Sequence, residues 1–153
     1  MWECGHTPVC ASGMTATEST DQRRLIAGHE AGHAIVAHHF GSYVSEIKIG
    51  GLDDCQGVTW CPAGHRSRRA MITVALAGLA ADLELLGLDP AESCAGEDYS
   101  LAQSLVSSED MIGRRLEDAC KILWKHRAQW QRLTERLMTV DELTATEIWA
   151  VIS

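Results

Sequence analysis

The residues most able to do chemistry stand together in the run His29-Glu30-Ala31-Gly32-His33. Residues four apart share one face of a helix, so the two imidazoles can converge on one ion, and imidazole nitrogen is a common zinc ligand. Glu30 stands where its carboxylate can take a proton from a water whose pKa the metal lowers. The small residues of the run suit a helix that passes close to a metal and a neighbouring sheet. The pattern predicts a zinc-dependent metallopeptidase.

A catalytic zinc site of this kind needs a third protein ligand, with a water in the fourth position. His39 lies six residues after His33, the distance used in the long motif HExxHxxGxxH, but Val36 replaces the glycine that turns the chain back to the metal. Two carboxylates remain as candidates for the third ligand. Glu84 lies within an apolar segment, and Asp98 lies near the start of a later predicted helix. The residues themselves leave this choice open.

The elements that must position these groups are mostly helical. Ser19 and Gln22 form a capping box ahead of a helix that carries the motif and that Gly41 can end. Residues 43–49 then alternate apolar and polar side chains, and residues 57–60 offer a second extended piece, which together predict a hairpin or small sheet. We expect residues 58–60 to form its edge strand.

Further helices follow along the chain. We expect a buried helix over residues 70–87, a helix headed by Glu97 and Asp98, a long helix over residues 111–138, and a short terminal helix behind a capping box at 144–147. The fold class predicted is mainly α (α+β), with a small β-sheet or hairpin and a C-terminal helical bundle.

Composition limits the classes of function. The 153 residues suit one domain, which we expect at 21–153 after a flexible leader at 1–20. A formal net charge of −8 argues against a nucleic-acid partner. The apolar stretch before Asp82 is shorter than the roughly 20 residues of a membrane span. Six cysteines without a CxxC pair and no signal peptide favour reduced thiols in a cytoplasmic protein.

Beyond the motif helix, successive blocks of the chain resemble those of the FtsH-type zinc peptidase domain, in the same order. The resemblance covers about residues 22–152 and implies that fold, with His29, His33 and Asp98 as zinc ligands and Glu30 as the catalytic carboxylate. Zn²⁺ is therefore the expected cofactor. The matching blocks are residues 43–49, 56–59, 77–87, 96–102, 119–127 and 143–148.

The chain also departs from that family. Its usual members are membrane-anchored and carry an ATPase, but this chain has neither a predicted membrane span nor the phosphate loop GxxxxGK[ST]. Leu79 and Asp82 stand where the family more often has Arg and Glu, so we expect the surface contacts between subunits to differ. A homo-oligomer and a separate ATPase or adaptor stay open as partners.

Three functions are consistent with these residues. The leading hypothesis is a stand-alone endopeptidase that cuts unstructured or loosely folded protein without ATP. The second is a regulatory peptidase that cuts one specific protein. The third is a zinc-binding interaction module without turnover, and the presence of Glu30 counts against it because a non-catalytic site needs no carboxylate there.

Overall fold

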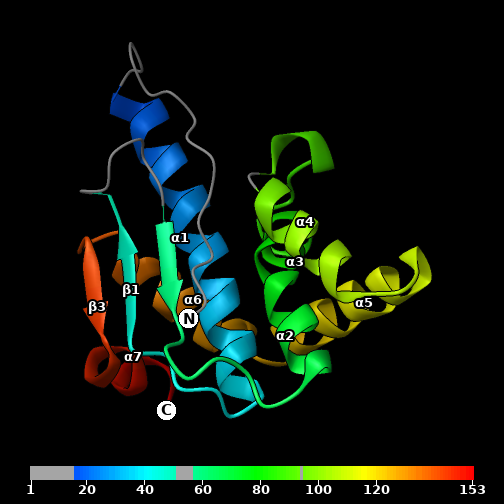
Figure 1. The fold of residues 1–153 in the computed structure, drawn as a ribbon. Coiled ribbons are helices and arrows are strands. Elements are labelled where there is room, and N and C mark those ends of the chain that lie inside the picture. Colours follow the sequence, from blue (N-terminus) through cyan, green and yellow to red (C-terminus); the bar gives the residue numbers. More distant parts are fainter. Residues whose placement is uncertain (1–15, 51–56, 94) are drawn as a thin grey trace.

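The computed structural model describes residues 16–50, 57–93 and 95–153, and for 16–19 it describes the backbone alone. These residues are mainly helical, with a three-stranded antiparallel sheet beside the first helix (Figure 1), which confirms the predicted fold class. In chain order the elements are α1 (Ala16–His39), β1 (Glu46–Ile49), β2 (Gly57–Trp60), α2 (Arg68–Ala75), α3 (Ala77–Glu84), the short 3-10 helix η1 (Pro90–Glu92), α4 (Gly96–Leu105), α5 (Glu109–Lys125), α6 (Arg127–Leu137), β3 (Glu142–Thr144) and α7 (Ala145–Ile152).

The motif helix α1 begins earlier than the sequence predicts. Its first residue is Ala16, so Ser19 lies inside the helix and the predicted capping box is wrong. Residues 1–15 of the expected leader lie outside the described part of the chain. The end of α1 is as predicted: Gly41 has a φ of +72° and donates its N–H to the His38 carbonyl at 2.9 Å. This left-handed closing residue is what a glycine permits after a helix.

Two of the predicted helices are each divided in two. The segment 70–87 breaks at Leu76 (φ −85°, ψ −4°), and the segment 111–138 breaks at His126 (φ −107°, ψ 22°), so continuous helices were the wrong prediction. The break at Leu76 lets α3 pack along α1 while α2 packs on α4 and α5. The break at His126 likewise sends α6 back along α1 to α7.

The sheet has the strand order β2-β1-β3, with both neighbouring pairs antiparallel. β2 forms one edge of this sheet, which confirms the edge strand predicted for residues 58–60. β3 was not predicted; Leu143 of β3 pairs with Ile47 of β1, and both side chains are fully buried. Thr144 then caps α7 through the predicted capping box with Glu147.

Buried apolar side chains form two clusters. The larger one joins α1 to the sheet, α3 and α5–α7, and the indole of Trp130 donates to the Gly28 carbonyl of α1 at 2.8 Å. The smaller cluster joins α2, α4 and the start of α5 around Ile72, Leu76 and Ala102. In Figure 1, α1 runs between the sheet and helices α2–α5. No helix among the described residues is long and apolar enough to cross a membrane.

Candidate metal centre

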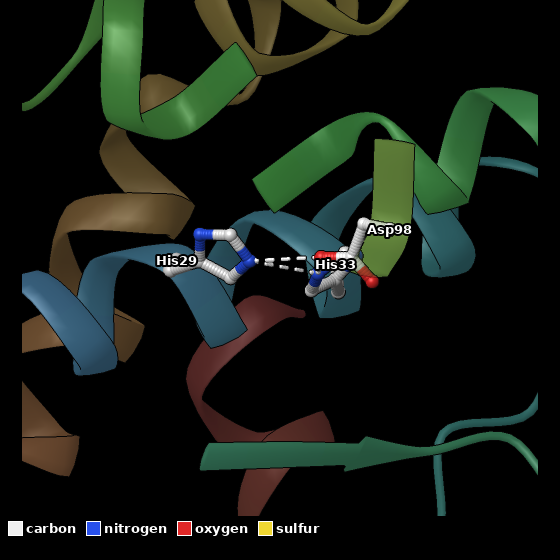
Figure 2. Close-up of side chains that lie close together, drawn as sticks. All are labelled: His29, His33 and Asp98. Carbon is white, nitrogen blue, oxygen red and sulfur yellow. Dashed lines mark hydrogen bonds and ion pairs between the residues drawn. The ribbon is translucent and has the colours of Figure 1, made fainter. Parts of the chain in front are cut away.

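The two motif histidines and Asp98 lie together in the interior. His29 and His33 come from successive turns of α1, and Asp98 comes from the first turn of α4, which lies against them (Figure 2). The Asp98 Oδ2 atom is 3.1 Å from His29 Nε2 and 3.2 Å from His33 Nε2, and the two Nε2 atoms are 3.2 Å apart. Each of the three residues is at most 2% exposed.

These separations fit a tetrahedral metal ion. Zinc bonds of about 2.0–2.1 Å at the tetrahedral angle place neighbouring ligand atoms about 3.3 Å apart. The observed distances of 3.1–3.2 Å are close to that edge length. Two imidazoles and one carboxylate also form a donor set that zinc and related divalent metals accept, and they leave a fourth position for water. The cluster can therefore hold a metal ion, although geometry alone does not identify the metal.

The other nitrogen of each histidine is held by a hydrogen-bond partner. His33 Nδ1 lies 2.7 Å from the Val74 carbonyl, and His29 Nδ1 lies 2.8 Å from Asp82 Oδ2. Because a carbonyl or carboxylate oxygen can only accept, Nδ1 carries the hydrogen in the neutral form of each ring, and Nε2 can then present its lone pair to the common point. Such contacts fix the tautomer and the orientation of a ligating imidazole.

Asp82 is the functional residue that the sequence analysis misplaced. We treated it as a surface position at which contacts between subunits differ from those of the family, but it is 2% exposed and accepts a hydrogen bond from His29 of α1. Besides His29 it binds the Ser93 hydroxyl, which donates to Oδ2 at 2.6 Å. A carboxylate directly after Ala80 and Ala81 in an apolar helix was the available signal, because a buried acid needs a hydrogen-bonding partner.

The two buried carboxylates change the titration of His29 in the metal-free protein. Burial of the ring lowers its pKa, but the hydrogen bonds that it donates to Asp82 and then to Asp98, together with the charge of Asp82, outweigh burial and raise the pKa from 6.5 to about 9. The centre thus attracts positive charge strongly, and a proton and a metal ion compete for His29.

Glycines allow the helices to approach this closely. A Cβ at Gly78 of α3 would overlap the His29 ring, and a Cβ at Gly32 would lie 2.8 Å from the Ala77 carbonyl oxygen of α3. Such a distance is too short for any ordinary carbon contact. The predicted close approach at Gly32 is therefore present, but the neighbour is helix α3 instead of the sheet.

Glu30 lies between α1 and the edge strand β2. The residue is fully buried, and the Thr59 hydroxyl of β2 donates to its Oε2 at 2.7 Å and to its backbone carbonyl at 3.0 Å. A Cβ at Gly57 would lie 2.8 Å from Glu30 Oε1, so β2 passes directly over the carboxylate. The candidate base is therefore held next to the edge strand.

The rival ligands lie elsewhere. Glu84 is exposed and accepts a hydrogen bond from the Trp124 indole at 3.3 Å. His39 is exposed at the end of α1 and faces His126. Cys61 is buried in the larger cluster, away from this site, whereas Cys55 and Cys94 lie outside the described part of the chain.

Comparison with known proteins neither supports nor contradicts the family resemblance. No protein-family profile matches the chain, and no characterised protein matches it significantly. The FtsH-type resemblance therefore stays a prediction that depends on the order and content of the sequence blocks.

Proposed function

We propose that this protein is a zinc-dependent metalloendopeptidase. The observation that carries the proposal is the convergence of His29, His33 and Asp98 at 3.1–3.2 Å, with Glu30 next in the chain and placed beside an edge strand. The resemblance to FtsH-type peptidases supports the same ligand set. When bound, zinc would lower the pKa of water and polarise the carbonyl of the scissile peptide bond.

The chain's own residues supply the remaining parts of the reaction. Glu30 takes the proton of the attacking water and passes it to the leaving amine. Thr59 holds one oxygen of that carboxylate, which limits its rotation. The outer edge of β2 suits a substrate segment that is already extended, because such a segment can pair with it through main-chain hydrogen bonds. We therefore propose unstructured or loosely folded protein as the substrate, cut without ATP.

Casein cleavage by zinc-loaded protein tests this function. We expect slow degradation with or without ATP, none after chelation, and none by Glu30→Gln, which keeps its zinc because Glu30 is not a ligand. The amide oxygen of the variant can still accept from Thr59, so the local fold is retained. Zinc-loaded wild-type protein that cuts no unstructured substrate would contradict the proposal and favour the interaction module. Cleavage of a single protein only would favour the regulatory peptidase.

A further inference from the structure

A second pair of histidines reproduces the geometry of the pair in the metal centre. His39 Nδ1 lies 3.2 Å from His126 Nε2, the same distance that separates the Nε2 atoms of His29 and His33. The rings of the second pair meet at 62° with centroids 5.4 Å apart, against 66° and 4.9 Å in the first. Nitrogen atoms at this separation can bind one ion along a tetrahedral edge.

One histidine of the second pair, His126, is held like those of the first pair. His126 Nδ1 lies 2.8 Å from Gln129 Oε1, which can only accept, so His126 carries its hydrogen there and presents the Nε2 lone pair to His39. Gln129 is held in turn because its Nε2 donates to the Ile152 carbonyl at 3.0 Å. This support corresponds to that of His29 by Asp82.

The position of the pair in the fold makes it accessible. His39 is the last residue of α1, and His126 is the residue at which α5 breaks and α6 begins. His39 is exposed and His126 is half-buried, so an ion can reach both from solution.

Both charge and protonation bear on binding at this pair. The pKa of His39 is lowered, first by burial and then by nearby positive charges, those of His126, Lys125, His38 and Arg69. The ring is therefore neutral at neutral pH and able to bind a metal. The same cations oppose a metal ion, but Asp118 forms an ion pair with Arg69 at 3.2 Å.

We propose that His39 and His126 form a second metal site, distinct from the buried centre, which takes a divalent transition metal such as Zn²⁺, Ni²⁺ or Cu²⁺. These metals prefer imidazole, and water completes the coordination. With two protein ligands and open access, the site binds more weakly than the buried centre and exchanges its metal faster. Occupancy ties the end of α1 to the α5–α6 junction.

Calorimetric titration of Ni²⁺ into protein already loaded with one equivalent of zinc tests the site. We expect the wild type to take one further equivalent, His39→Ala and His126→Ala to lose it, and Gln129→Ala to bind about 10-fold more weakly because its loss frees the His126 ring. His38→Ala is the matched control, since this neighbour packs on Trp149 instead, and it should bind like the wild type.

The proposal is overturned if the wild type takes no further equivalent, or if His39→Ala and His126→Ala bind it unchanged. If His38→Ala and His39→Ala lost Ni²⁺ binding to the same extent, the assignment of the site to His39 and His126 would also be contradicted. Because none of these residues is fully buried, circular dichroism should show every variant folded. The titration does not measure peptidase activity. The second metal site can therefore be disproved while the proposed function holds, and the proposed function can be disproved while the second site holds.

Discussion

At the scale of single residues, the candidate metal centre combines the three possible ligands with groups that orient the histidines, Asp82 for His29 and the Val74 carbonyl for His33. The types and spacing of His29, Glu30 and His33 were sufficient to predict a metal-binding helix, and the family resemblance selected Asp98 from two carboxylates. The role of Asp82 could not be read from the sequence because it arises from the crossing of α3 over α1. Spacing along one helix carries no information about such a crossing.

Replacing Asp82 with asparagine tests its contribution. The amide oxygen of Asp82→Asn can still accept from His29 Nδ1, but the negative charge that makes the imidazole a stronger ligand is lost. We expect about 10-fold weaker zinc binding, the lower end of the usual effect of removing such a partner. Competition with a chromophoric chelator measures this affinity. Asp110→Asn, at an exposed position in the first turn of α5, removes the same charge as a control and should leave the affinity unchanged.

At the scale of elements, helical periodicity predicted where helices lie but not where they break. The breaks at Leu76 and His126 carry neither glycine nor proline, and apolar spacing continues across both, so the sequence gives no local stop signal. The packing differs in emphasis on the two sides of each break. α3 packs mainly on α1 and α5 and α2 mainly on α4 and α5, whereas α6 packs on α1 and α7 and α5 mainly on α3 and α2. β3 escaped prediction for a related reason: three residues with one buried side chain show too little alternation to be recognised.

The crossing of α1 and α3 gives a sharp prediction at Gly78. Alanine there would place a methyl group in the His29 ring, so His29 or α3 must shift. We expect Gly78→Ala to destabilise the metal-free protein by about 1–3 kcal/mol, as overpacking does, and to weaken metal binding. Urea unfolding and metal titration measure the two effects.

Gly113 is the matched control for Gly78. It lies within α5 with no atom within 4 Å of an added Cβ, so Gly113→Ala should stabilise by up to about 1 kcal/mol through helix propensity. If both variants gain stability and bind metal like the wild type, the close approach at Gly78 is not what positions His29.

At the scale of the whole molecule, the metal centre connects the two apolar clusters. α1 supplies two ligands from the larger cluster, while Asp98 belongs to α4, whose buried Ala102 packs in the smaller cluster. A bound ion would therefore join parts of the chain that have separate cores. The sequence predicted both helices, but it did not reveal the two clusters. These divide across the faces of α2, which places Val74 in the larger cluster and Ile72 in the smaller one.

This connection predicts where metal removal loosens the protein. α4 packs on the smaller cluster and exposes most of its surface to solvent, so a metal bound by Asp98 would add substantially to its attachment. Helices α6 and α7 carry no ligand, so the metal should affect them little. We expect hydrogen exchange to accelerate at 96–105 when one equivalent of zinc is removed, and to change little at 127–137. Mass spectrometry of peptic fragments measures both segments.

Asp98→Asn provides the control for this exchange experiment. Its amide is a much poorer zinc ligand than a carboxylate, so added zinc should give residues 96–105 little protection in this variant. Glu84→Gln changes an exposed carboxylate of α3 that lies outside the cluster, and its protection should match the wild type. Protection of α4 that persists in Asp98→Asn but disappears in Glu84→Gln would contradict Asp98 as the ligand and would assign the metal to Glu84 of α3 instead.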